Sequence, residues 1–132
     1  DEANMTIDYI CGQAEAEAES GDVGLVIVDY IQLIGGGPSK GESREQELSR
    51  ISKRLKQLAK KLKCPVITPA QLNDDGRLRE SRAIGQDADV VLKINDKGVN
   101  VDKFRNAPRF QTLPLALRGE FQRFEHENTF QR

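Results

Sequence analysis

The sequence predicts an α/β fold in which a small parallel sheet is followed by an antiparallel extension. Two short aliphatic runs, residues 25–28 and 65–68, lack polar alternation, which is typical of strands covered on both faces of a parallel sheet. The residues between them have the 3-4-3-4 apolar spacing of a crossover helix. After residue 98, short alternating segments separated by turns favour antiparallel strands.

The two long helices are predicted from their caps and their apolar periodicity. Thr6 is the predicted N-cap of the first helix, in which apolar residues recur at helical spacing up to Ser20. Ser43 and Gln46 form a capping-box signature at the start of the crossover helix. The apolar stripe of that helix consists of Leu48, Ile51, Leu55, Leu58 and Leu62. We interpret the lysines near its end as a solvated face rather than a DNA-binding face.

The remaining elements are predicted from turn residues and from alternation. In chain order they are a glycine-rich loop at 35–41, a polar loop at 73–77, a short helix ending near Gln86, a third strand at 90–94, an alternating strand at 99–105, a turn at 106–108, a returning strand at 112–117, a turn at Gly119 and a last strand closed by Phe121 and Phe124. These later strands form the antiparallel extension.

Composition narrows the classes of function. The numbers of Lys+Arg (20) and Asp+Glu (21) nearly cancel, so the chain lacks the basic field of many duplex-binding domains. A nucleic-acid partner stays open, because a ring of subunits can concentrate basic side chains or backbone hydrogen-bond donors at its centre. Cys11 and Cys64 are interpreted as buried free thiols rather than as a disulfide or a metal site, which fits a reducing compartment. With no membrane-length apolar run and no signal peptide, we expect a cytoplasmic protein without a membrane partner.

Three groups of polar residues are candidates for chemistry. Asp29 ends the first aliphatic strand and Gln71 ends the second, at the sheet edge where open α/β folds bind ligands. A carboxylate there can hold Mg²⁺, and an amide can donate to a γ-phosphate. Lys103 and Arg105 are two residues apart on one predicted strand and therefore point the same way. Such a pair on a projecting hairpin can reach into the site of another subunit and neutralise charge on a phosphoryl group there. From these residues alone, a strand-ending turn explains Asp29 at least as well. An ordinary polar strand end is the favoured interpretation of Gln71, and a basic hairpin edge that of Lys103 and Arg105.

Several blocks of the chain, from about Thr6 to Glu125, carry a resemblance to a known family. The first is Gly-Leu-Val-Ile-Val-Asp-Tyr-Ile-Gln-Leu-Ile at residues 24–34. The other blocks follow along the chain: residues 44–52 leading through 58–60 to 64–67, Ala-Gln-Leu-Asn at 70–73, Leu-Arg-Glu-Ser at 78–81, Gln-Asp-Ala-Asp at 86–89, Lys-Phe-Arg-Asn at 103–106 and Phe-Gln-Arg-Phe at 121–124. In residues and in order, these blocks resemble the DnaB family of hexameric replicative DNA helicases, in which the first block is the Walker B strand. Together, ordered blocks are far more specific than any one of them.

The resemblance implies the second half of a RecA-like P-loop NTPase core, so residues 1–132 would form a partial motor domain. Such domains use ATP bound between adjacent subunits of a homo-hexameric ring. Asp29 would position Mg²⁺, and Gln71 would sense the γ-phosphate. Lys103 and Arg105 would act in trans on the ATP of the neighbouring subunit.

The resemblance also implies a DNA-binding loop that contains Arg79, Glu80 and Arg82. Loops at this place face the central channel of the ring and grip single-stranded DNA mainly through its phosphates. An exposed ion pair is the alternative interpretation of Arg79 and Glu80. Arg82 stands where the family usually has glycine, and Gly85 where glutamate is common, so this loop departs from the family pattern. Primase and a helicase loader are further expected partners.

The implied function is ATP-dependent translocation on single-stranded DNA and unwinding of duplex DNA at the replication fork. A RecA-like recombinase or clock-type ATPase is one alternative, which the run at 29–33 and the block at 103–106 disfavour. The other is a non-catalytic module that binds helicase subunits. This alternative is motivated by the missing upstream half of the motor.

We predict that the purified chain does not hydrolyse ATP by itself. Neither a Gly-Lys-Ser/Thr loop nor the glutamate that activates water in the family occurs in these 132 residues, so nothing holds the β- and γ-phosphates. Phosphate release from Mg²⁺ and ATP, measured for the chain and for its Asp29→Asn variant, checks this. Activity that depends on Asp29 would contradict it.

Overall fold

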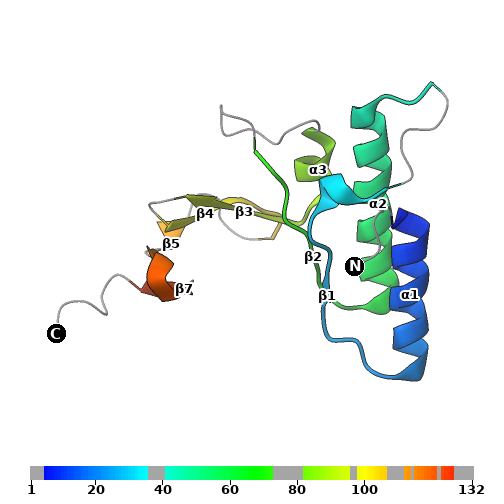
Figure 1. Cartoon of the computed structure of the whole chain (residues 1–132), viewed down its shortest axis with the longest axis horizontal. Helices are drawn as coiled ribbons and strands as arrows, with labels where there is room; N and C mark the ends of the chain where they lie inside the picture. The colour runs from blue at the N-terminus through cyan, green and yellow to red at the C-terminus, as the bar shows by residue number, and fades with distance from the viewer. Residues whose placement is uncertain are drawn as a thin grey trace. The chain divides into compact units, whose positions relative to one another are not determined.

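The computed structural model describes residues 5–35, 41–72, 82–95, 98–106, 112–113, 115–121 and 123–126. The chain divides into two compact units, Asp1–Ala88 and Asp89–Arg132. The first unit contains both long helices and a parallel strand pair, and the second contains antiparallel strands (Figure 1). Within the described ranges, no helix has the length and apolar character needed to cross a membrane.

The order of helices and strands agrees with the order predicted from the sequence. The first unit contains helix α1 (Ile7–Ser20), strand β1 (Val26–Ile27), the 3₁₀ turn η1 (Ile31–Leu33), helix α2 (Arg44–Leu62), strand β2 (Val66–Ile67) and helix α3 (Arg82–Asp87). The second contains β3 (Val90–Asn95), β4 (Gly98–Phe104), β5 (Thr112–Leu113), β6 (Leu115–Arg118), the 3₁₀ turn η2 (Gly119–Phe121) and β7 (Arg123–His126).

Both predicted helix caps are confirmed. The Thr6 hydroxyl accepts a hydrogen bond from the backbone N–H of Tyr9 at 3.2 Å, at the start of α1. At the start of α2, the backbone N–H of Gln46 donates to Ser43 Oγ at 3.2 Å. The backbone N–H of Ser43 donates in return to Gln46 Oε1 at 2.8 Å. Both ends of the capping box are therefore satisfied, which fixes where α2 begins.

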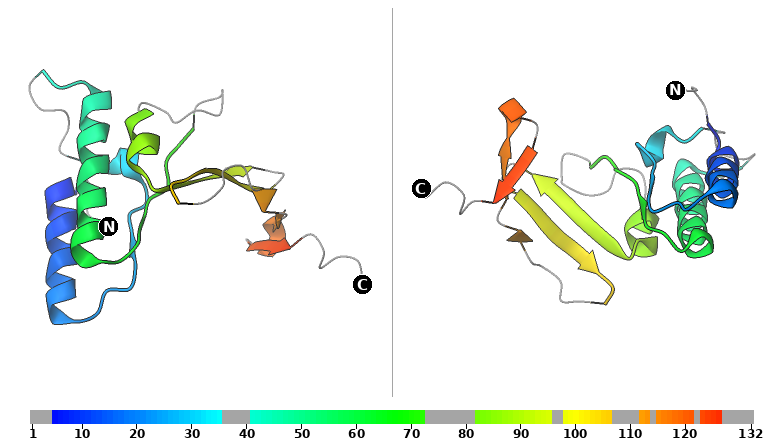
Figure 2. Two further views of the ribbon diagram at one scale, coloured as in Figure 1. Left: turned by 180° about the vertical axis from the view of Figure 1, so that it is seen from behind. Right: turned by 90° about the horizontal axis from the view of Figure 1, so that it is seen from below.

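The core of the first unit forms where α1, α2 and the parallel strands meet. Helices α1 and α2 lie side by side, with β1 and β2 next to them (Figures 1 and 2). The buried cluster consists of Ile7, Cys11, Val28, Ile31, Ile34, Leu48, Ile51, Leu55, Leu58 and Ile84. The predicted stripe of α2 supplies four of these side chains, and Leu62 packs against the cluster while partly buried.

The prediction of buried free thiols is confirmed, because Cys11 and Cys64 are both buried and form no disulfide bond. Burial raises the pKa of the Cys11 thiol above its ordinary value, since the thiolate loses hydration there. Cys11 therefore serves as a small apolar residue in the core.

The two parallel strands are shorter than predicted and are covered on one face only. Val26 lies opposite Val66 and Ile27 opposite Ile67. The two valines are partly buried against the helical core, whereas Ile27 and Ile67 are 64% and 53% exposed. The prediction of coverage on both faces is thus wrong for the described residues. Successive side chains of a strand alternate between faces, and the helices of this unit pack on one of them.

The second unit is built from antiparallel pairs. β3 confirms the strand predicted at 90–94, but its hydrogen-bonded neighbour is β4, so it is not a third member of the parallel pair. β4 also pairs with β5, and β6 pairs with β7. Phe121 lies in η2 rather than in the last strand, where it was expected.

At Gly98, the first residue of β4, the backbone lies so close to other backbone atoms that a side chain would not fit. Its φ is 123°, a conformation that L-residues rarely adopt. A Cβ at this position would lie 2.8 Å from the carbonyl oxygen of Leu115 and 3.0 Å from that of Leu113. Glycine is therefore required at position 98, where the backbone passes close to Leu113 and Leu115.

Replacing Ser43 by alanine is expected to destabilise the chain by about 1 kcal/mol, because the N-terminal amides of α2 lose their capping acceptor. Urea unfolding followed by circular dichroism measures this. Ser49→Ala, in the interior of the same helix, is the matched control and should leave the free energy of unfolding unchanged or slightly higher. Equal losses in the two variants would contradict the capping assignment.

Candidate functional site

The candidate site lies where β1 and β2 end, at the same end of the parallel pair. The ladder is continued there by the backbone N–H of Val28, which donates to the carbonyl of Ile67 at 2.9 Å. Beyond it, the Thr68 hydroxyl donates to the carbonyl of Val28 at 2.8 Å. The N–H of Ile31 then donates to the carbonyl of Pro69 at 3.2 Å. Hydrogen bonds therefore hold the two strand ends together.

Asp29 and Gln71 both follow these strand ends. The carboxylate of Asp29 and the amide of Gln71 belong to exposed residues at the same end of the pair. The structure thus places the two residues as the sequence predicted, at one sheet edge. Among the described residues, no group of three or more His, Cys, Asp or Glu could hold a metal ion alone. A single carboxylate still suits Mg²⁺ in a nucleotide site, where phosphate and water oxygens supply the other ligands.

Gln32 connects the two strand ends, although it was not among the site residues predicted from the sequence. Its side-chain Nε2 donates to the carbonyl of Gln71 at 3.4 Å. The backbone N–H of Gln71 donates to Gln32 Oε1, also at 3.4 Å. One amide side chain therefore satisfies both backbone groups of Gln71. The nearest sequence signal was the position of Gln32, three residues after Asp29.

Arg44, the first residue of α2, extends this network into the core. One guanidinium nitrogen donates to the backbone carbonyl of Gln32 at 2.6 Å. The other donates to Glu47 Oε2 at 2.5 Å. Glu47 is completely buried, and its second carboxylate oxygen has no hydrogen-bond partner among the described residues. The sequence signal for this burial was the position of Glu47, one helical turn before the apolar Ile51.

In the second unit, a β-bulge determines which way Lys103 points. Val101 lies opposite Leu92, whereas Lys103 lies opposite Val91, so Asp102 is the extra residue. The carboxylate of Asp102 is 3.2 Å from Lys93 Nζ. The bulge therefore interrupts the simple alternation predicted for 99–105 and places Lys103 on the face of Val91.

Arg105 follows the end of β4 and pairs with Asp89. Its backbone N–H donates to the carbonyl of Asp89 at 2.9 Å, and its Nε is 2.9 Å from Asp89 Oδ1. Asp89 and Val91, which lie opposite Arg105 and Lys103, are two residues apart. The two cations consequently share one face of the hairpin, as the sequence predicted.

Of the three predicted DNA-binding residues, one lies in the described part of the chain. Arg82 is the first residue of α3 and is exposed to solvent. Arg79 and Glu80 lie outside the described residues.

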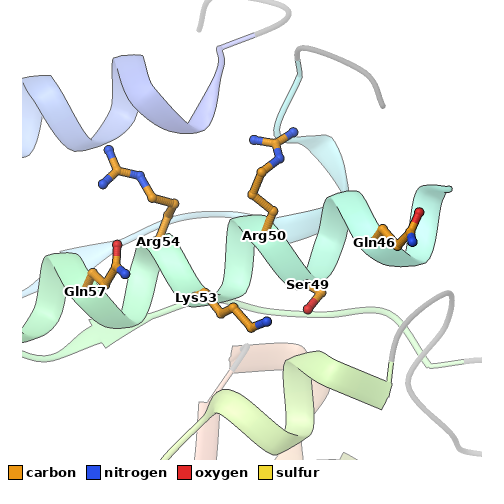
Figure 3. A pocket seen from close by; sticks show the side chains of 6 residues that line it. All are labelled: Gln46, Ser49, Arg50, Lys53, Arg54 and Gln57. Carbon is orange, nitrogen blue, oxygen red and sulfur yellow. The ribbon is translucent and has the colours of Figure 1, made fainter. Parts of the chain in front are cut away.

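A hollow lies on another surface of the first unit, and none of the predicted site residues lines it. It has a volume of about 460 Å³ and is lined by Gln46, Ser49, Arg50, Lys53, Arg54 and Gln57 of α2. Arg50 and Arg54 project from one side of the helix and Lys53 from the other (Figure 3). Arg50 pairs with Glu42 at 3.2 Å and Arg54 with Asp8 at 3.0 Å, so these cations are already neutralised by surface carboxylates.

Comparison with known proteins gives consistent matches. The family model described as "DnaB-like helicase C terminal domain" matches residues 1–126. The replicative DNA helicase DnaB of Pasteurella multocida (strain Pm70) is 38% identical, over 82% of this chain and 28% of that protein. The replicative DNA helicase DnaB of Mycobacterium intracellulare is 40% identical, over 94% of this chain and 25% of that protein. The chain thus spans between a quarter and a third of the length of these curated relatives.

A solved structure is also similar. It is described as a DnaB-like replicative helicase and its interactions with primase. It is 31% identical, with a TM-score of 0.78, and the match covers 96% of this chain and 36% of that one. The fold predicted from the sequence, a RecA-like core with an antiparallel extension, is confirmed by these matches.

Removing the guanidinium with Arg44→Ala is expected to lower the free energy of unfolding by about 3 kcal/mol, since it leaves the buried Glu47 carboxylate uncompensated. This is the lower end of the range for buried pairs, because 35% of the Arg44 side chain is exposed. Urea unfolding measures the loss.

The matched control is Arg50→Ala on the same helix, which breaks a more exposed pair with Glu42 and should cost less than about 1 kcal/mol. Combining Arg44→Ala with Glu47→Leu should recover much of the lost stability, because the stranded charge is then gone. If the double variant is as unstable as Arg44→Ala, the buried charge is not the cause.

Proposed function

This chain belongs to the family of DnaB-like helicase C-terminal domains, and we propose that it works as part of an ATP-dependent replicative DNA helicase. In the intact protein, ATP hydrolysis would drive translocation on single-stranded DNA and unwinding of duplex DNA at the replication fork. The observation that carries the proposal is the position of Asp29 and Gln71 at one end of a parallel strand pair, in a chain with this family match.

Asp29 is the proposed Mg²⁺ residue. Its carboxylate is exposed at the strand end, and the coordination of Mg²⁺ in NTPases needs one such group beside phosphate oxygens. The ion neutralises charge on the β- and γ-phosphates of ATP. The exposed amide of Gln71, from the adjacent strand end, would contact the γ-phosphate and report its presence.

Lys103 and Arg105 are the proposed cations that act on the ATP of the neighbouring subunit. Their shared face on the hairpin lets both reach one phosphoryl group. The pair between Arg105 and Asp89 does not oppose this, because their side chains are 50% and 59% exposed. Exposed pairs contribute little stability, so exchanging Asp89 for a phosphate costs little.

The proposed partners are single-stranded DNA, the other subunits of a homo-hexameric ring, primase and a helicase loader. Primase is suggested by the solved relative, whose description names it. Arg82 is exposed at the start of α3 and, with Arg79 and Glu80, belongs to the proposed DNA loop. Arginine and backbone contacts to phosphates would bind a strand without reading its sequence.

The uncovered face of the parallel pair supports the view that residues 1–132 are part of a larger motor domain. Leu25, Ile27 and Ile67 are each 45% exposed or more. Parallel sheets are normally covered on both faces, because apolar side chains project from each. We propose that the phosphate-binding half of the motor supplies this cover, and that the ATP site is complete only with it.

Replacing Arg105 by alanine in the intact protein is expected to lower kcat for ATP hydrolysis by about 10³-fold or more, as for other arginine fingers. Asp29→Asn should also be inactive, through loss of the Mg²⁺ ligand. Mixed rings of the two inactive variants should regain part of the activity. In them, a site with intact Asp29 receives Arg105 from its neighbour.

Arg123→Ala, which removes an exposed cation of β7, is the matched control and should keep full activity. Subunit exchange is verified by mass spectrometry before the assay. If the mixed rings regain no ATP hydrolysis, action of Arg105 in trans is ruled out. Normal ATP hydrolysis by Arg105→Ala would rule out the arginine-finger role altogether.

A further inference from the structure

We propose that Gln32 is a positioning residue that holds the main chain of Gln71 in place, and that Arg44 and Glu47 anchor Gln32 to the core. The inference rests on the proposed function, in which the Gln71 side chain contacts the γ-phosphate. The juxtaposition that carries it is the contact of one amide side chain with both backbone groups of Gln71.

The first step concerns what holds Gln71 once the strands have ended. After Asp29 the chain turns into η1, and among the described residues the hydrogen bond from Ile31 N–H to the Pro69 carbonyl is the last backbone link between the two strand ends. Gln71 lies two residues further on. There the Gln32 amide offers a donor and an acceptor, as the peptide unit of a paired strand would.

The second step concerns whether Gln32 is itself fixed. Its backbone carbonyl accepts from the Arg44 guanidinium at 2.6 Å. Arg44 is held in turn by Glu47, which is 0% exposed and belongs to the helix that supplies four of the ten core side chains. A charge-assisted pair in such surroundings is short and well directed. Gln32 is therefore fixed to α2, and through it Gln71 is too.

The third step separates positioning from stability. Gln71 is exposed, so water can replace the Gln32 amide at its backbone groups when that amide is removed. The free energy of unfolding then falls little, whereas the backbone that carries the Gln71 side chain is no longer held in one position. Misplacement of a group by about 1 Å lowers the rate of a chemical step much more than it lowers substrate binding.

The test uses the intact protein with Gln32→Met, which keeps the length of the side chain but removes its hydrogen bonds. DNA-stimulated ATP hydrolysis should lose roughly tenfold to hundredfold in kcat. KM for ATP should stay within about twofold. Gln32→Glu retains the acceptor for the Gln71 N–H and should fall between wild type and Gln32→Met.

Hydrogen exchange provides a structural readout in the same samples. Exchange of the backbone amide of Gln71 should become faster in Gln32→Met, while the amides of the α2 core remain protected. Gln57→Met, an exposed glutamine of α2, is the matched control and should change neither kcat nor exchange at Gln71. Unchanged exchange at Gln71 in Gln32→Met would overturn the positioning role.

Gln71→Ala separates a failure of this inference from a failure of the proposed function. If Gln71→Ala is inactive and Gln32→Met has normal kcat, the positioning role is wrong and the proposed sensor stands. If Gln71→Ala has normal activity, the sensor role is wrong and the inference is wrong with it. In the double variant, Gln32→Met should add no further loss to Gln71→Ala, and an added loss would show that Gln32 acts elsewhere.

Discussion

Burial of the apolar stripe of α2 is the constraint on which the first unit depends. Leu48, Ile51 and Leu58 are at most 2% exposed, and each contributes roughly 2 kcal/mol by leaving water. A helix that buries one face in this way fixes its neighbours: α1 and the parallel strands pack against it. The carboxyl ends of β1 and β2 are held in register by this packing, and with them the exposed Asp29 and Gln71.

The polar network beside the strand ends depends on the same packing. Glu47 is buried because it lies on the inner side of α2, and Arg44 compensates its charge while also binding the Gln32 carbonyl. A buried carboxylate with one guanidinium partner adds little net stability compared with an apolar pair. Here the guanidinium also donates to the Gln32 carbonyl, which ties the strand end to α2. Core burial and the geometry of the site are therefore linked through one ion pair.

The second unit positions its cations by a different device. Its strands carry many exposed apolar side chains, and the register of β3 with β4 shifts by one residue at the bulge at Asp102. The bulge moves Lys103 to the face of Val91, and Arg105 continues the same face. Bulges commonly redirect side chains near functional sites, since one extra residue reverses the alternation beyond it.

Local signals in the sequence determined the helices, their caps, the order of the strands and the candidate residues Asp29 and Gln71. Capping and 3.6-residue periodicity act over a few neighbouring residues, so they can be read without a fold. Only the tertiary structure decided which strand face is covered, where β3 pairs, which residue bulges and how Gln32 reaches Gln71. Each of these depends on contacts between residues far apart in the chain, and their free energies are set by packing rather than by local sequence.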